Sequence, residues 1–293
     1  MEELRMEARR FSPRTRLDAA RVVNAYIAGW PYSRPIGEGL LRNWEKTGRI
    51  QPDNMWICYR DGNPAAFLHG EHRDMETAVA YMLAVVPGAE REAGWLLAEF
   101  EASARAAGMR RLIGPNHSGG AFYGGYVLGL EPFHPHWSTA VTDLFLRAGF
   151  RITNPAVMLS RRLDAAVRVE CPPAGYEIAR LAPGEEFEAV AFGYHAMFRG
   201  EEVARCCARL YPHLESPCGG IVGQIGPVRT DEEHRGRGLA RIMTTMCARD
   251  LRAMGASEAL VTTSLENFPA LRAYERAGFS RKHFLMEWSK TLQ

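Results

Sequence analysis

The two halves of the chain repeat one pattern, and this repeat constrains the fold more than any other feature. The segments LFLRAGF and AYERAGF end at Phe150 and Phe279, and a strand-like stretch follows each of them. Upstream, each half has an extended apolar run, a short charged loop with glycine, and a helix-like segment that ends at Gly108 or Gly255. Internal similarity of this length predicts two copies of one fold.

The order of elements within a copy predicts an α/β sheet. In the second half, apolar residues recur at helical spacing and form one stripe of an amphipathic helix. The stripe contains Leu239, Ile242, Met243, Met246, Cys247, Leu251 and Met254. A strand over 258–263, a helix over 269–277 and a last strand should follow. Alternating strands and helices of this kind are typical of α/β proteins.

The length of the chain also suggests two domains. It has 293 residues, and one domain usually takes roughly 100–200. The best candidate linker is CPPAGY, residues 171–176, because two prolines and a glycine interrupt regular structure. We therefore predict domains over 1–172 and 173–293. The alternative is that CPPAGY is a loop opening the first strand of the second domain.

Charge and composition argue against several classes of protein. Lys and Arg number 36 against 34 for Asp and Glu, and a net charge of +2 does not suit a dedicated nucleic-acid or anionic-membrane binder. The longest apolar stretch, near 78–86, is about half of the ~18 residues that cross a bilayer. The first residues, MEELRMEARRF, lack the apolar core of a signal peptide. Six cysteines without CxxC spacing suggest reduced thiols in a cytoplasmic protein, although the vicinal Cys206 and Cys207 leave a redox pair open.

The segment VRTDEEHRGRGLA, from Val228 to Ala240, has the features of a phosphate-binding loop. Its two glycines allow a tight turn before the predicted helix, whose first amides have no intrahelical partner. Two arginines and the helix dipole add positive potential, so a phosphate or pyrophosphate is the expected ligand. The loop is neither a Walker loop nor GxGxxG, since no GK[ST] follows and Arg241 replaces the third glycine. A simple turn at a helix start is the alternative.

This loop and a later motif together resemble the acyl-CoA-binding core of the GNAT superfamily of N-acetyltransferases. The family pattern V-x-T-x-x-x-x-[RQ]-x-x-G-x-[GA] is matched by Val228, Thr230, Arg235, Gly238 and Ala240. The later pattern N-x-x-A-x-x-x-Y-x-x-x-G-F is matched by Asn267, Ala270, Tyr274, Gly278 and Phe279. The resemblance implies two tandem GNAT-like domains, each a mixed, mostly antiparallel sheet flanked by helices. A tandem arrangement with one degenerate copy is also similar to that of the mycothiol synthases.

The resemblance implies acetyl-CoA or another acyl-CoA as co-substrate and assigns roles to particular residues. The loop would hold the coenzyme A pyrophosphate through Arg235, Gly236, Arg237, Gly238, Leu239 and Ala240. The backbone at Val228 and Thr230 would pair with the pantetheine arm like an added strand. Asn267 would hydrogen-bond the same arm or the next helix. Tyr274 would protonate the departing thiolate, and its alternative role is to pack its helix on the sheet.

Two features depart from the family pattern. Where many relatives have a glutamate on the strand before the loop, this chain has Gln224, and an amide cannot accept a proton at neutral pH. The open alternatives for a general base, each of which could instead have a surface or capping role, are Glu266, Glu287, His234 and His195, the last expected on an upstream helix. Residues 185–212 are expected to be mainly helical, so the family's β-hairpin should be absent or very short.

The first copy should not bind coenzyme A. Its opening helix, RLDAARVVNAYIAGW, and a hairpin, MWICYRDGNPAAFLHGE, which should turn at its Asp-Gly pair, precede a strand in ETAVAYMLAVV. Its loop, PGAEREAGWLL, places Glu90 and Glu92 where a pyrophosphate would lie, and a tryptophan crowds the turn. The helix over 94–108 is expected to be three residues shorter than the one over 238–255.

The segment from Gly114 to Trp137 is rich in glycine, aromatic residues and histidine. Candidates to line a substrate pocket or a domain interface are Phe122, Tyr123, Tyr126, His134 and Trp137. The alternative is an ordered loop that packs on its own domain. His117, His134 and His136 lack a fourth ligand at regular spacing, so no metal site is expected.

On this resemblance we expect an N-acyltransferase that moves an acetyl or short acyl group from acyl-CoA to an amine of a small molecule by direct attack. A thiol-bearing amine is a specific substrate hypothesis. We expect no nucleic-acid or membrane partner, and a homodimer is left open. The alternative from another class is a non-catalytic acyl-CoA-binding or sensing protein, and a third is a scaffold with two inert copies.

Overall fold

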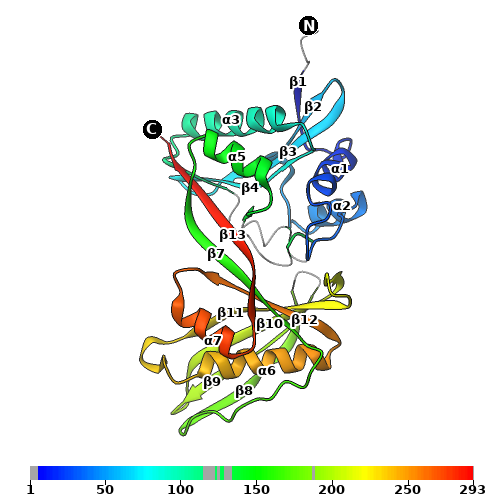
Figure 1. The fold of residues 1–293 in the computed structure, drawn as a ribbon. Helices are drawn as coiled ribbons and strands as arrows, with labels where there is room; N and C mark the ends of the chain where they lie inside the picture. The colour runs from blue at the N-terminus through cyan, green and yellow to red at the C-terminus, as the bar shows by residue number, and fades with distance from the viewer. Residues whose placement is uncertain (1–5, 115–122, 124–125, 129–133, 187–188, 293) are drawn as a thin grey trace. The chain divides into compact units, whose positions relative to one another are not determined.

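The computed structural model describes residues 6–114, 123, 126–128, 134–186 and 189–292. Contacts divide the chain into two compact units, each with its own hydrophobic core. Unit 1 consists of Met1–Asn154 and Leu285–Gln293, and unit 2 consists of Pro155–Phe284. Each unit is a mixed, mostly antiparallel sheet flanked by helices (Figure 1), so the predicted fold class is confirmed. No helix in the described ranges is long and apolar enough to cross a membrane.

The units differ from the predicted domains 1–172 and 173–293 because two strands extend beyond those limits. Strand β7 (Arg151–Arg162) pairs with β12 (Ala256–Ser264) of unit 2, and strand β13 (Ser280–Thr291) ends by pairing with β5 (Arg111–Gly114) of unit 1. CPPAGY therefore lies within unit 2, before its first hairpin. Proline and glycine mark a break in regular structure there, but strand pairing decides which unit each residue joins.

Unit 1 contains β1 (Met6–Arg10), α1 (Arg16–Tyr26), α2 (Glu38–Lys46), η1 (Pro52–Asn54), β2 (Met55–Arg60), β3 (Asn63–His72), β4 (Thr77–Val85), α3 (Glu90–Ala106), β5, β6 (His134–Pro135) and α5 (Thr139–Arg147). Its strands run in the order β1-β2-β3-β4-β5-β13, and β4 and β5 are parallel. The β2–β3 hairpin turns at Asp61 and Gly62, which have φ of 49° and 81°. The expected Asp-Gly turn and the opening helix are both confirmed.

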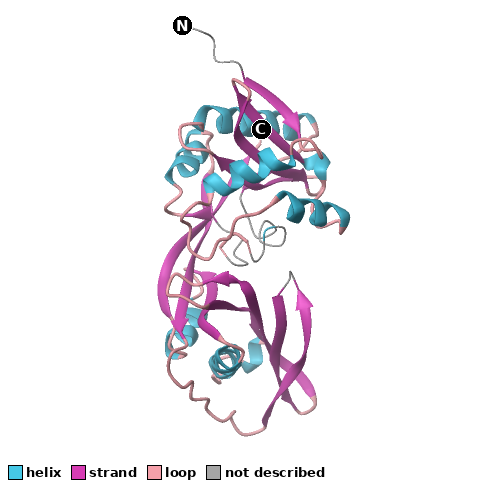
Figure 2. Cartoon of the chain, turned by 90° about the vertical axis from the view of Figure 1, so that its right-hand side faces the viewer, coloured by secondary structure: helices cyan, strands magenta, loops and turns pink. Residues whose placement is uncertain are grey.

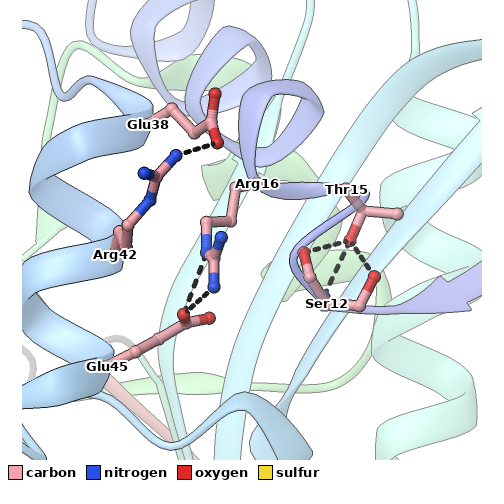
Figure 3. A network of polar contacts seen from close by, with 6 residues as sticks. All are labelled: Ser12, Thr15, Arg16, Glu38, Arg42 and Glu45. Carbon is pink, nitrogen blue, oxygen red and sulfur yellow. Dashed lines mark hydrogen bonds and ion pairs between the residues drawn. The ribbon is translucent and has the colours of Figure 1, made fainter.

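Helices α1 and α2 of unit 1 are joined by a buried ion pair. Arg16 donates from Nε to the Glu45 carboxylate at 2.9 Å, and both side chains are less than 15% exposed (Figure 3). Glu38 and Arg42 pair one turn apart on α2, and Thr15 accepts the Ser12 N–H just before α1. These contacts fix the start of α1 against the end of α2.

Unit 2 contains β7, β8 (Tyr176–Glu186), β9 (Ala189–Phe198), β10 (Glu201–Glu215), β11 (Ile221–Thr230), η2 (Glu232–His234), α6 (Leu239–Ala253), β12 and α7 (Phe268–Arg276). Its strands run in the order β7-β12-β11-β10-β9-β8, with β11 and β12 parallel. Helices α6 and α7 contact one another and pack on the same core (Figure 1). The predicted amphipathic helix, the strand after it and the next helix are therefore confirmed.

The expected helix over 185–212 is wrong, because its described residues belong to the strands β8, β9 and β10 (Figure 2). Burial alternates with a period of two in β10, where Ala204, Cys206 and Ala208 face the core. Alanine, glutamate and arginine are good helix formers, so composition favoured a helix that strand pairing overrides. The hairpin is present, turning at Arg199 and Gly200, and His195 lies on a strand.

The expected helix lengths are also wrong. Helix α3 of unit 1 has 17 residues and α6 of unit 2 has 15. Helix α3 begins at Glu90 rather than at Gly94, since its two early glutamates suit the positive end of a helix dipole.

Candidate functional site

Strands β11 and β12 separate part-way along their length. Their parallel pairing runs from Ile221 and Ala256 to Ile225 and Val261, and then stops. Strand β11 continues to Thr230 and stays paired with β10 on its other side. In the described part of unit 2, the β12 side of Gly226–Thr230 therefore has no strand partner. An edge of this kind can accept an extended ligand as an added strand.

A bulge shapes β11 where the two strands part. Gly226 and Pro227, joined by a cis peptide, lie opposite the single residue Cys207 of β10. Arg209 Nη1 donates to the Gly226 carbonyl at 2.6 Å, which holds the bulge. Two buried hydroxyls, those of Thr230 on β11 and Thr262 on β12, have no partner among the described residues. Because an unsatisfied buried hydroxyl costs free energy, a polar ligand between these strands would be stabilised.

The predicted phosphate loop leads directly into α6. Gly236 and Gly238 adopt φ of 77° and 80°, which residues with a side chain rarely adopt. Gly238 is the N-cap, and no side chain caps the helix that begins at the buried Leu239. The first amides of α6, including that of Ala240, are therefore open to an anion at the positive end of the helix.

The two loop arginines are exposed beside these amides. Arg235 donates from Nε to the Thr230 carbonyl at 3.2 Å, and Arg237 lies over the ring of Tyr176 at 6.0 Å. Their contacts hold them near the loop without a strong ion pair, since Glu232 approaches Arg235 only to 4.0 Å. Both guanidinium groups can therefore turn toward an anion.

His234 fastens the loop to the sheet. Its Nδ1 lies 2.9 Å from the hydroxyl of Tyr176 on β8, and its ring packs on Tyr176 and on Phe198 of β9. The His234 ring therefore holds the loop against β8 and β9. The sequence analysis missed Tyr176 and Phe198, and no local motif marks them, because the contact joins strands 36 to 58 residues from the loop.

Helix α7 carries the other two predicted residues. The Asn267 side chain accepts the Ala270 N–H at 3.3 Å and so caps the helix. Tyr274 is 5% exposed and packs in the core with Phe279, at a ring separation of 6.5 Å. Tyr274 thus has the predicted packing role, and any chemical role is additional.

A polar network lies on the face of the sheet opposite α6. Cys206 Sγ lies 3.6 Å from Cys247 Sγ of α6, so its neighbour Arg205 points to the other face, together with its strand partner His195. Glu202 lies 3.2 Å from His195 Nδ1 and 2.6 Å from Arg205 Nη2. Hydrogen bonds from Arg205, and also from Arg229 and His195, lower the pKa of Glu202 to about 2. The Glu202 carboxylate is therefore ionised at neutral pH and can fix the Nδ1–H tautomer of His195.

Gln224 and the two glutamates considered as general bases lie elsewhere. Gln224 is buried on β11, where it pairs with Arg209 of β10. Glu266 is exposed, and its N–H binds the Ser264 hydroxyl. Glu287 belongs to unit 1 and accepts a hydrogen bond from Thr153.

Unit 1 has a different arrangement at the matching positions. A Cβ placed on Gly114 of β5 would lie 3.0 Å from that of Ala80 on β4, so the two strands remain in close contact. In the first turn of α3, the buried Glu92 carboxylate binds Arg60 Nε at 2.7 Å, and Arg60 also donates to the Gly88 carbonyl. The hydrogen bond from Arg60 lowers the pKa of Glu92. A fixed carboxylate thus lies at the helix start where unit 2 has open amides.

Of the aromatic segment, Phe122 and His117 lie outside the described residues. Tyr123 binds His69 Nδ1 at 3.0 Å, and Tyr126 packs on Trp44, so both are buried within unit 1. His134 Nε2 lies 3.1 Å from the Ser138 carbonyl, and burial lowers the pKa of His134 to about 4. Trp137 packs edge-on to Trp30. Among the residues described, these side chains contact their own unit, and no group of three metal-ligating side chains occurs there.

Residues 165–279 match the profile of the Acetyltransferase (GNAT) family. The chain is similar to two mycothiol acetyltransferases. The protein of Cellulomonas flavigena is 32% identical over 85 residues, 28% of this chain and 24% of the relative. The protein of Catenulispora acidiphila is 25% identical over 177 residues, 49% of this chain and 56% of the relative. The matched segments thus span between a quarter and just over half of these relatives.

Solved structures share the fold across both units. A GCN5-related N-acetyltransferase from Sphaerobacter thermophilus aligns with a TM-score of 0.68 and 19% identity, over 98% of this chain and 95% of that chain. A tandem GNAT protein from the clavulanic acid biosynthesis pathway aligns with a TM-score of 0.72 and 15% identity, over 98% of both chains. The tandem GNAT arrangement predicted from the repeat is therefore confirmed at the level of the fold.

Proposed function

We propose that unit 2 is an N-acyltransferase that transfers an acetyl or short acyl group from acyl-CoA to an amine of a small molecule. One observation carries the proposal: the open edge of β11 leads, within one short loop, to the uncapped N-terminus of α6. The open edge of β11 can bind an extended arm that contains amides, and the N-terminus of α6 can bind a pyrophosphate. Coenzyme A contains both groups in this order.

Different residues of the site would then bind different parts of the coenzyme. The amides of Gly238, Leu239 and Ala240 and the side chains of Arg235 and Arg237 bind the pyrophosphate. The β11 backbone at Val228 and Thr230 binds the pantetheine arm. Asn267 holds the start of α7, which carries Tyr274 to the same core as α6.

The reaction would be a direct attack of a neutral amine on the thioester carbonyl. The carbon–nitrogen bond forms, the carbon–sulfur bond breaks, and backbone N–H groups of β11 stabilise the oxyanion between these steps. Tyr274 donates a proton to the departing thiolate. We propose that His195 accepts the proton that the amine loses. The Nδ1 of His195 faces the ionised Glu202 carboxylate, so Nε2 is the nitrogen that accepts this proton.

We propose that the acceptor approaches from the face opposite α6. Both helices in the described part of unit 2 pack on the other face, and the polar side chains of His195, Glu202, Arg205 and Arg229 lie on this one. A small amine is therefore the substrate class. A thiol-bearing amine is the specific hypothesis, supported by the similarity to mycothiol acetyltransferases.

The alternative is a non-catalytic acyl-CoA-binding or sensing protein. It is favoured by one observation, namely that the strand before the loop carries the amide Gln224 instead of an acid. The two functions share the coenzyme site and differ in turnover.

The first experiment is a thermal-shift titration with acetyl-CoA. At about 100 times its dissociation constant, a ligand adds ~2.7 kcal/mol of stability, which amounts to several degrees. Gly238→Glu should abolish the shift. Gly219→Glu is the matched control, since it introduces the same side chain at a φ of +84°, in the turn before β11. A shift that survives Gly238→Glu would place the coenzyme elsewhere.

Turnover is measured next, by release of free thiol with a panel of amines that includes cysteine derivatives. Acylated product, identified by mass spectrometry, would support the enzyme. Binding of acetyl-CoA without product from any amine would support the sensing protein instead.

A further inference from the structure

A cavity of about 310 Å³ in unit 2 has an unusual concentration of positive charge. It lies between α6, the end of α7 and residues 166–170, which form part of the connection from β7 to β8. Four guanidinium groups and one carboxylate line it: Arg161, Arg168, Arg241, Arg276 and Glu170. A cavity of this size is in the range of small-ligand sites.

The connection from β7 to β8 is fastened to α6 at two points. Near its start, the Leu163 carbonyl accepts a hydrogen bond from Arg252 Nε at 2.9 Å, in the last turn of α6. Near its end, Glu170 forms a bidentate ion pair with Arg241, in the first turn. Arg168 lies between these anchors, so the backbone that carries it is held against the cavity.

A third arginine is held at the cavity wall by the end of α7. Arg161 Nη1 donates to the Ala277 carbonyl at 2.6 Å and so offsets the negative end of the helix dipole. Gly278 allows this approach, because a Cβ there would lie 3.3 Å from the Arg161 guanidinium. Burial lowers the pKa of Arg161, so its charge would gain from an anion nearby.

The other two arginines are uncommitted. Arg168 and Arg276 are exposed and form no ion pair with any residue that the structure describes. The guanidinium groups of Arg168 and Arg276 lie beside that of Arg161, which is hydrogen-bonded to Ala277. Together they are suited to bind an anion with several acceptor oxygens and more than one negative charge.

We propose that this cavity binds a phosphate monoester, at a site separate from the amides at the start of α6. The proposal extends the proposed function, because Arg241 is the third residue of α6 and links the cavity to the pyrophosphate loop. The phosphate has two conceivable sources: the 3′-phosphate of coenzyme A itself, or a second phosphorylated molecule.

The test compares the wild type with Arg168→Gln and Arg276→Gln, and uses Arg180→Gln as the control. Arg180 is an exposed arginine of β8 outside the cavity, so the control removes the same charge from the same unit. Calorimetry gives the dissociation constants of coenzyme A and of 3′-dephospho-coenzyme A. Thermal shift with inorganic phosphate measures binding of a free phosphate.

If the coenzyme is the source, wild type and control should bind coenzyme A about tenfold tighter than the dephospho form, and each cavity variant should lose that ratio. If a second molecule is the source, the ratio should be near one, and phosphate should stabilise wild type and control only. Cavity variants that match the wild type in both measurements would overturn the proposal. If neither coenzyme form binds any of the proteins, the proposed function fails, and the phosphate measurement still decides whether the cavity binds an anion.

Discussion

Arg60 Nε lies 2.7 Å from the buried Glu92 carboxylate in the first turn of α3. In unit 2 the matching turn of α6 has no side-chain cap and begins with a glycine in the left-handed conformation. Neither helix start has a side-chain cap, but a buried carboxylate occupies the first turn of α3, whereas the first turn of α6 has no acidic residue. The first two predictions follow from this difference.

Arg60→Met should destabilise unit 1 by about 3 kcal/mol at pH 7, because it leaves the Glu92 carboxylate buried without its partner. The pKa of Glu92 is lowered in the folded state, so the pair stabilises the protein above the ordinary glutamate pKa of 4.5 and loses this effect as the pH falls through the lower value. In the variant, Glu92 should accept a proton at a higher pH. Urea unfolding should therefore show a penalty that shrinks as the pH falls to and below the ordinary glutamate pKa of 4.5. A penalty independent of pH would contradict this account.

Unit 1 should bind no coenzyme A. The buried Glu92 carboxylate, held by Arg60, places negative charge in the first turn of α3, where a pyrophosphate would have to lie. Calorimetric titration with acetyl-CoA should give one site per chain, and Gly238→Glu should reduce it to none. Two sites per chain would show that the first repeat is functional.

His234→Phe should weaken coenzyme binding rather than slow the chemical step. The imidazole fastens the loop to Tyr176, so its loss frees the loop without removing a reacting group. We expect the KM for acetyl-CoA to rise roughly tenfold with kcat nearly unchanged. Tyr176→Phe removes the same hydrogen bond and should have the same effect. A fall in kcat alone would instead favour His234 as the base.

His195→Gln should lower kcat by about 100-fold and leave acetyl-CoA binding unchanged, as expected for loss of a general base. Glu202→Gln should have a smaller effect in the same direction, since it removes the group that orients the imidazole. An unchanged kcat in His195→Gln would exclude this histidine from proton transfer.

Tyr274→Phe should lower kcat for amines by about 100-fold while keeping the packing of α7. The ring lies in the core with Phe279, and phenylalanine preserves that contact. Circular dichroism and the acetyl-CoA thermal shift should match the wild type. Activity with thioesters of more acidic thiols should fall less, because their leaving groups need less help from an acid.

Local motifs predicted the loop and the helix that form the proposed coenzyme site. The glycines at 236 and 238 and the stripe on α6 depend on backbone geometry and period, which a single segment determines. The β9–β10 hairpin was mispredicted because its residues favour a helix when isolated, and only pairing with β8 and β11 makes them strands. The His195–Glu202 contact and the Tyr176–His234 contact depend on the register of that hairpin, so they could not be predicted without it.

The course of β13 has a consequence for synthesis on the ribosome. Residues 285–293 complete the sheet of unit 1, yet they are made only after all of residues 155–284. During synthesis the edge of β5 therefore stays unpaired until the whole of unit 2 has emerged. Unit 1 cannot complete its sheet before unit 2 has been synthesised, although most of unit 1 comes first in the sequence. A gene fragment that stops before residue 285 would encode all of unit 2 but would leave unit 1 without the part of β13 that pairs with β5.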